Sequence, residues 1–188
     1  VLHDGLLELA MWRLSSMHGG NPLPVITLDV DGLPIETFGS QSGTGYNRYV
    51  GCTHYSPLVA SIAETGDMVG GLLREGNCGN ASCADQWIPK LVERIRHTTG
   101  SSVQVRFDAG FTGDPTLAAL DRANIPFVGR IKSNAVLERE AAHYLRRPPD
   151  RPPLEPREWC HAFYYKAENW DQHRRIVLVV SERPDDLF

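Results

Sequence analysis

Two short apolar segments of this sequence, far apart along the chain, each end in an aspartate that is followed closely by glycine. Residues 25–31 end in Asp31, and residues 102–108 end in Asp108. Both segments are rich in residues that favour β-structure, so we expect two buried strands. A carboxylate at the end of a buried strand lies at the rim of a sheet, where it can bind a divalent cation. If the two acids share a cation, their strands must be neighbours.

The remaining segments predict an α/β fold with a mixed sheet. Apolar spacing and turn residues predict helices over 4–17, after a Ser82 cap with a kink at Pro89, around 117–121 and over about 134–145, and strands over 34–39, 57–64, 67–74 and 126–131. The two-residue junction Thr65-Gly66 predicts a tight hairpin. The expected order is an antiparallel meander, a helix, the second acidic strand, a helix, a strand and a helix.

A proline-rich stretch at residues 146–153 separates this region from two further predicted strands, Cys160–Lys166 and Arg175–Ser181. We therefore expect three parts: an N-terminal helix in 1–20, an α/β core in 21–147, and a linker with a β-rich segment in 148–188.

Composition is that of an ordinary globular protein. The 188 residues carry a net charge of −4 and are 41% hydrophobic, which allows one sizeable core and gives no general sign of a nucleic-acid partner. No apolar run is long enough to span a bilayer and no signal peptide opens the chain, so we expect a cytoplasmic protein. Of the four cysteines, Cys78 and Cys83 form a closely spaced pair, but no second Cys or His pair with matching spacing accompanies them. This favours free thiols over a zinc site.

Three interpretations of the acidic residues compete. Asp29-Val30-Asp31-Gly32 resembles the motif of haloacid-dehalogenase-type phosphotransferases, with Asp29 as nucleophile, Asp31 as acid/base and Lys132 as phosphate partner. A strand is predicted after Gly32 where that family has a loop and helix. Alternatively, Asp31 and Asp108 are metal ligands of an RNase H-like site, whose strand order the prediction matches. In the third interpretation, each aspartate merely opens a turn before a glycine.

Several motifs together resemble the DDE-type transposases of bacterial insertion sequences, over about residues 20–180. The motifs are Leu28–Gly32, Gly39–Gln41, Tyr46–Asn47, Tyr55–Leu58, Phe107–Phe111 and Arg130–Asn134. The resemblance implies an RNase H-like catalytic core with a β-rich insertion, which cuts and joins DNA at transposon ends with Mg²⁺ or Mn²⁺. It implies Asp31 and Asp108 as the first two catalytic acids and metal ligands. Asp29 stays an alternative to Asp31, because Gly32-Leu33 stands where that family has a small residue and Thr.

The same resemblance implies a third acid, a glutamate in a Tyr-x-x-Arg-x-x-x-Glu helix, and the sequence has no such motif. Glu155, Glu158, Glu168 and Glu182 lack that context. We therefore expect a truncated catalytic set, with a catalytically inactive DNA-binding remnant as the alternative to an active enzyme.

Arg130 and Lys132 follow a predicted strand at the expected active-site edge. They are candidates for contacts with DNA phosphates, and a solvated strand end is the alternative. The implied partners are DNA, as transposon ends and as target, and a second copy of the chain in a homodimer; no membrane partner is expected.

Overall fold

The computed structural model describes residues 2–48, 50–146 and 154–183. The chain divides into two compact units, Val1–Ile131 and Lys132–Phe188. The predicted division into residues 1–20, 21–147 and 148–188 concerns functional parts and stays a prediction.

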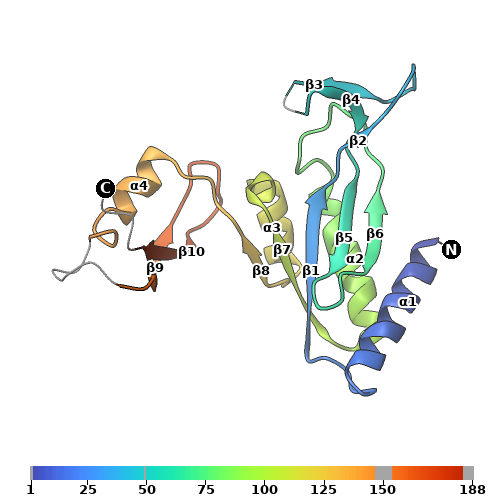
Figure 1. The fold of residues 1–188 in the computed structure, drawn as a ribbon, viewed down its shortest axis with the longest axis horizontal. Helices are drawn as coiled ribbons and strands as arrows, with labels where there is room; N and C mark the ends of the chain where they lie inside the picture. Colours follow the sequence, from blue (N-terminus) through green and yellow to red (C-terminus); the bar gives the residue numbers. More distant parts are fainter. Residues whose placement is uncertain (1, 49, 147–153, 184–188) are drawn as a thin grey trace. The chain divides into compact units, whose positions relative to one another are not determined.

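The first unit is built around a five-stranded sheet with the strand order β6-β5-β1-β7-β8 (Figure 1). Its elements in chain order are α1 (Leu2–Met17), β1 (Val25–Gly32), β2 (Ile35–Glu36), β3 (Gly45–Asn47), β4 (Cys52–Tyr55), β5 (Leu58–Ile62), β6 (Met68–Leu72), α2 (Ala84–Thr99), β7 (Ser102–Phe107), the 3₁₀ helix η1 (Ala109–Phe111), α3 (Asp114–Arg122) and β8 (Phe127–Gly129).

The pairing in this sheet is mixed. β1 runs antiparallel to β5, and β5 runs antiparallel to β6, whereas β1, β7 and β8 are parallel neighbours. Three antiparallel strands followed by two parallel strands joined through helices form the RNase H-like arrangement. The predicted fold class is confirmed, and the two acid-bearing strands are adjacent.

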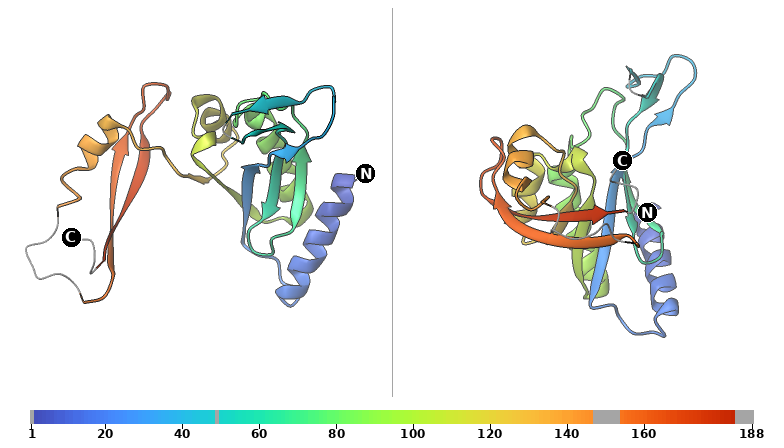
Figure 2. Two further views of the ribbon diagram at one scale, coloured as in Figure 1. Left: turned by 45° about the horizontal axis from the view of Figure 1, so that its top comes forward. Right: turned by 60° about the vertical axis from the view of Figure 1, so that its left-hand side comes forward.

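One face of β1 and β7 forms the centre of the core. Ile26, Leu28 and Val30 alternate with more exposed residues along β1, as expected for a strand with one buried face. Helix α2 buries a stripe of apolar residues and lies over the sheet, where Trp87 and Leu91 crowd Gly70 of β6. Helix α1 packs along β6 (Figure 2). Each buried Ile or Leu side chain contributes about 1.5–3 kcal/mol relative to exposure.

The antiparallel meander differs from its prediction in two places. Between β1 and β5, the chain forms a separate three-stranded sheet in the order β2-β4-β3, so the predicted strand 34–39 is reduced to Ile35–Glu36. The hairpin between β5 and β6 does not turn at Thr65-Gly66 alone. Its last bond joins the Ile62 amide to Asp67 O, and Gly66 has a left-handed φ of 74° within a wider loop.

Helix α2 also starts one residue later than predicted. Its N-cap is Cys83 rather than Ser82, and the Cys83 side chain makes no cap hydrogen bond. Cys83 has a φ of 64°, an unusual left-handed conformation for a residue other than glycine. Helix α2 continues through Pro89.

The second unit contains α4 (Ala135–Ala141) and the antiparallel pair β9 (Arg157–Tyr165) and β10 (Arg174–Glu182). The predicted strand pair is confirmed, and α4 is shorter than the predicted helix 134–145. The Tyr144 ring stacks on one face of this pair, 4.6 Å from the His161 ring. The predicted linker lies almost entirely outside the described residues.

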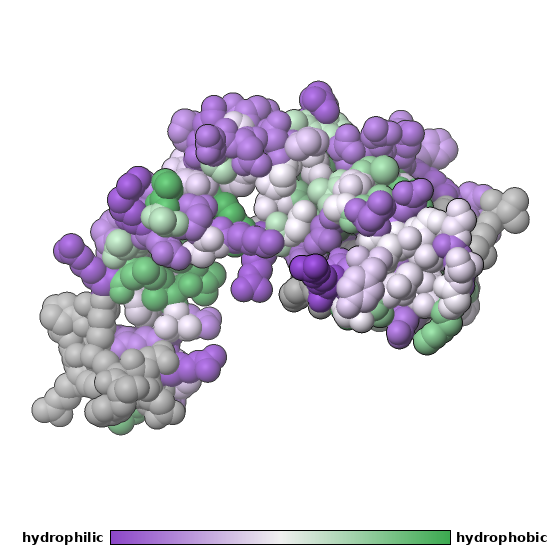
Figure 3. All heavy atoms as spheres, turned by 90° about the horizontal axis from the view of Figure 1, so that it is seen from above, coloured by the Kyte–Doolittle hydropathy of each residue, from purple (hydrophilic) through white to green (hydrophobic). Residues whose placement is uncertain are grey.

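Apolar side chains also reach the surface of the second unit, where Figure 3 shows them over α4 and the β9–β10 pair. Tyr164, Val177 and Val179 are exposed on the other face of the pair. Among the described helices of the whole chain, none is long and apolar enough to cross a bilayer.

Candidate active site

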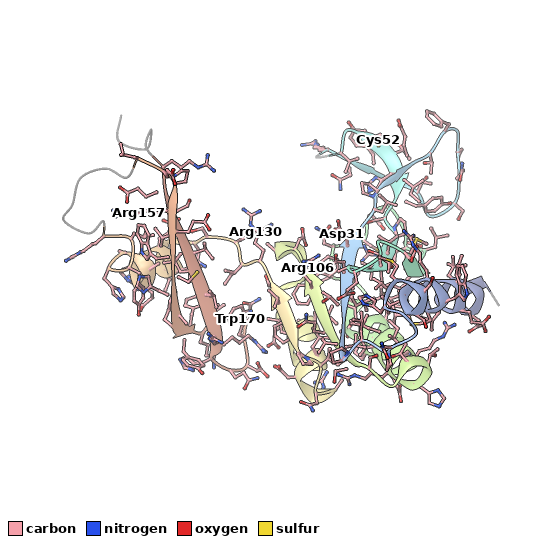
Figure 4. The ribbon with its side chains drawn as sticks, turned by 60° about the horizontal axis from the view of Figure 1, so that its bottom comes forward. Asp31, Cys52, Arg106, Arg130, Arg157 and Trp170 are labelled. Atoms are coloured by element: carbon pink, nitrogen blue, oxygen red, sulfur yellow. The ribbon has the colours of Figure 1, made fainter. Side chains whose placement is uncertain are left out.

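The two predicted acids occupy matching positions at the ends of neighbouring parallel strands. The ladder between β1 and β7 ends at the pair Val30–Phe107, and Asp31 and Asp108 are the next residues of the two strands. Strands paired in this way lie about 4.8 Å apart. Side chains alternate between the two faces along a strand. Both carboxylates therefore lie on the face of the sheet opposite the buried Val30 and Phe107. The structure therefore brings together the two residues that the sequence singled out, and Figure 4 shows Asp31 at the end of β1.

Each carboxylate is held by the turn that follows it. Asp31 Oδ1 accepts a hydrogen bond from the Gly32 amide at 2.7 Å, and Asp108 Oδ1 accepts one from the Gly110 amide at 2.8 Å. Within residues 2–48, 50–146 and 154–183, neither Oδ2 accepts a hydrogen bond. Both residues are exposed. One anionic oxygen of each acid is thus accessible at the rim of the sheet.

Asp29, the alternative first acid, is engaged elsewhere. Its Oδ1 and Oδ2 accept hydrogen bonds from Arg106 Nε and Nη2, both at 2.6 Å. This bidentate contact raises the pKa of Arg106, through the hydrogen bond first and the charge of Asp29 second. Asp29 and Arg106 are ladder partners on β1 and β7. Both oxygens of Asp29 are therefore occupied by a neighbouring cation, Arg106, which Figure 4 labels.

The role of Arg106 was missed in the sequence, although a signal was present. Arg106 precedes Asp108 by two residues, as Asp29 precedes Asp31. Once β1 and β7 are taken as parallel neighbours with the two aspartates level, this equal spacing places Arg106 beside Asp29. The buried residue Arg74 was missed as well, and no local pattern marked it.

The two basic candidates fall in different units. Arg130 is an exposed residue directly after β8, and its amide donates to Phe107 O at 3.3 Å, next to Asp108. Neither Arg130 nor Lys132 forms an ion pair with another described residue. Lys132 is the first residue of the second unit, and its role stays a prediction from the sequence.

A third ligand does not accompany the acidic pair in the described part of the chain, where no three His, Cys, Asp or Glu side chains are grouped as a metal site. Two of the glutamates considered in the sequence lie in the β9–β10 pair. Glu158 faces solvent, and Glu182 Oε2 accepts a hydrogen bond from Arg157 Nε at 2.7 Å.

Comparison with solved structures finds transposases. The piggyBac transposase synaptic complex with hairpin DNA is 18% identical, with a TM-score of 0.48 over 88% of this chain and 34% of that one. The Mos1 transposase paired-end complex with the left transposon end is 11% identical, with a TM-score of 0.35 over 76% of this chain and 53% of that one. A Mos1 paired-end complex with Mn is 12% identical over the same shares, with a TM-score of 0.32. The chain thus spans about a third of the piggyBac chain and about half of the Mos1 chain.

Sequence comparison assigns the family. No curated protein sequence matches the chain. The family model described as "Transposase DDE domain group 1" matches residues 7–188, which is nearly the whole sequence. The phosphotransferase interpretation is left without support, because β1 is followed by strands and Asp29 is paired with Arg106. The chain belongs to the group 1 family of transposase DDE domains.

Proposed function

We propose that this chain supplies the first two acids, Asp31 and Asp108, for metal-dependent cleavage and transfer of DNA strands at transposon ends. The observation that carries the proposal is the placement of two accessible carboxylate oxygens at adjacent strand ends. The alternative first acid, Asp29, is disfavoured because Arg106 neutralises it.

The donor set suits a hard divalent cation. Transposases of the DDE type use divalent metals, and carboxylate oxygens are the ligands that Mg²⁺ and Mn²⁺ prefer. Asp31 and Asp108 would hold the ion through the oxygens that their turns leave accessible. When bound, such an ion activates the attacking oxygen and stabilises the leaving oxygen of the phosphodiester. Two carboxylates offset only part of the cost of dehydrating the ion, so we expect weak binding by these residues alone.

The proposed partner is DNA, with a second copy of the chain acting on the second transposon end. Arg130 follows the strand beside β7, and its guanidinium is available to contact a phosphate near Asp108. With bacterial DNA as the substrate, the proposed reaction belongs in the cytoplasm. A DNA-binding domain without turnover is the competing possibility.

The test locates the metal and then removes its ligands. Fe²⁺ with ascorbate and peroxide should cut the polypeptide near residues 31 and 108, because hydroxyl radicals form at the bound ion. Mn²⁺ binding, followed by electron paramagnetic resonance, should weaken by at least about tenfold, or about 1.4 kcal/mol, in Asp31→Asn and in Asp108→Asn.

Asp29→Asn is the matched control, since it alters a carboxylate on the same strand. We expect its Mn²⁺ affinity to equal that of the wild type. If Asp29→Asn weakens binding more than Asp31→Asn does, Asp29 is the first ligand. If neither Asp31→Asn nor Asp108→Asn changes the affinity, the proposed site is refuted.

A further inference from the structure

A buried arginine lies next to the turn that follows Asp31. Arg74 follows β6 and is 5% exposed, and it is the only buried arginine in the described ranges 2–48, 50–146 and 154–183. Burial is the main cause that lowers the pKa of Arg74, yet an arginine remains charged in proteins. A buried, charged guanidinium needs hydrogen-bond acceptors, so the acceptors of Arg74 determine its structural role.

Arg74 binds oxygen atoms from two separate loops. Its Nε donates to Ser56 O at 2.7 Å, between β4 and β5. Its Nη1 lies within hydrogen-bonding distance of three carbonyl oxygens before α2, those of Gly79 at 3.1 Å and of Asn80 and Ser82 at 2.8 Å. The side chain thus fastens the loop of residues 73–83, which we call the β6–α2 loop, to the junction before β5.

The same loop lies beside both turns that hold the catalytic candidates. A Cβ atom on Gly32 would lie 3.8 Å from Arg74 Nη2. A Cβ atom on Gly110 would lie 2.7 Å from Asn80 Nδ2 and 2.9 Å from Asp108 Oδ1. Gly32 and Gly110 are the residues whose amides bind the two carboxylates. The Arg74 guanidinium therefore lies beside the turn of Asp31, and the loop that it organises lies beside the turn of Asp108.

We propose that Arg74 is a positioning residue, which fixes the turns of Asp31 and Asp108 relative to each other through the β6–α2 loop. This inference rests on the proposed function for its significance, because the spacing of the two carboxylates matters only if they share a cation. Groups that orient metal ligands from behind change metal affinity by about 10–100-fold when they are lost.

A lysine cannot replace this arginine. The guanidinium presents donors in a rigid planar fork, which reaches Ser56 on one side and the three carbonyl groups on the other. A lysine keeps the charge but offers a single ammonium group, so it cannot span both loops. Arg74→Lys therefore separates the geometry of the fork from the charge.

The chain contains a matched control. Arg96 also binds carbonyl oxygens, with Nη2 at 3.5 Å from Val103 O and 3.2 Å from Asn124 O. It lies near the end of α2, by the start of β7 rather than by its acidic end. Arg96→Lys should therefore lower stability without altering either turn.

The experiment records the backbone amide resonances of Gly32 and Gly110 by ¹⁵N–¹H correlation in the full chain without metal. Arg74→Lys should shift both resonances, although Arg74 bonds to neither amide, and Arg96→Lys should shift neither. The Mn²⁺ affinity should fall about tenfold in Arg74→Lys and stay unchanged in Arg96→Lys. Unmoved glycine resonances in a folded Arg74→Lys protein, or equal shifts in both variants, would overturn the inference.

A second variant covers the case in which Arg74→Lys does not fold. Asn80→Ser alters a side chain next to Gly110. It should shift the Gly110 amide and the Nε–H resonance of Arg74, and leave that of Arg96 in place. An unmoved Arg74 resonance would contradict the inference. The glycine resonances are recorded without metal, so they test the role of Arg74 independently. The proposed function fails separately if both Asp31→Asn and Asp108→Asn leave the Mn²⁺ affinity unchanged.

Discussion

Polar side chains bind each other across the two strands in the middle of the β1–β7 pair, but not at its end. In the middle, Gln104 Nε2 donates to Thr27 Oγ1 at 2.9 Å, and Arg106 binds both oxygens of Asp29. At the end, the carboxylates of Asp31 and Asp108 bind only the amides of their own turns, among the residues that the structure describes. All of these residues lie on the face of the sheet opposite the core. A reactive edge thus arises where the cross-strand pairing of polar groups ends.

The largest effect should come from the buried face, which is the same in the middle of the strand pair and at its end. Leu28 is completely buried between Ile26 and Val30 in β1. Leu28→Ala should lower the free energy of unfolding by about 2–5 kcal/mol, because it removes buried methyl groups and leaves a cavity. Urea denaturation measures the loss. Thr27→Ala, on the polar face, is the control, and an equal loss there would show that the two faces do not differ.

The second effect tests how tightly the end of the pair is built. A Cβ atom on Gly110 would crowd Asp108 Oδ1 and Asn80, so Gly110→Ala should displace the Asp108 carboxylate. We expect Mn²⁺ affinity to fall about tenfold, or about 1.4 kcal/mol. In Gly113→Ala, the control, the nearest neighbour is Pro115 Cδ at 3.9 Å, an ordinary contact. Unchanged affinity in Gly110→Ala would mean that this turn does not set the position of Asp108.

The third effect has the opposite sign. Without metal, two carboxylates on adjacent strands, about 5 Å apart, repel each other by up to about 1 kcal/mol in water. Asp108→Asn keeps an oxygen for the Gly110 amide but removes the charge, so it should raise the free energy of unfolding by a few tenths to about 1 kcal/mol. Thermal unfolding in chelator measures this gain. A loss of stability instead would indicate that the Asp108 charge has an attractive partner.

These residues also show how far the sequence alone could lead. The alternation of apolar residues in β1 and β7 and the glycines close behind the two aspartates were enough to predict two strands that end in acids, because both signals are local. That these strands are neighbours was predicted only from the RNase H-like order of the elements. Ser82 was predicted as the cap of α2, whereas the chain uses Cys83. The local pattern could not reveal that choice, because the loop before α2 is arranged by a distant residue: Gly79, Asn80 and Ser82 supply carbonyl oxygens to Arg74.

Arg74 itself was out of reach for the same reason. Its partners are backbone oxygens, which every residue type carries, so no side-chain motif announces the contact. The separate β2-β4-β3 sheet was missed because its strands are only two to four residues long, too short for a periodic pattern. The Asp29–Arg106 pair was predictable only after the strands had been placed in register.

The smallest effect concerns the ion pair in the middle of the strands, which Arg106→Gln removes. Arg106 is largely exposed, and exposed ion pairs contribute little and are screened by salt. We expect a small loss of thermal stability, smaller than the gain in Asp108→Asn. This loss should disappear near 1 M salt, where the Debye length is about 3 Å.

The Arg106→Gln variant also frees Asp29. Two residues along a strand correspond to about 7 Å, too far for Asp29 to coordinate an ion held at the strand end. Mn²⁺ affinity should therefore stay at the wild-type value, and a tighter affinity would show that the freed Asp29 reaches the ion and that the middle and the end of the pair form one site.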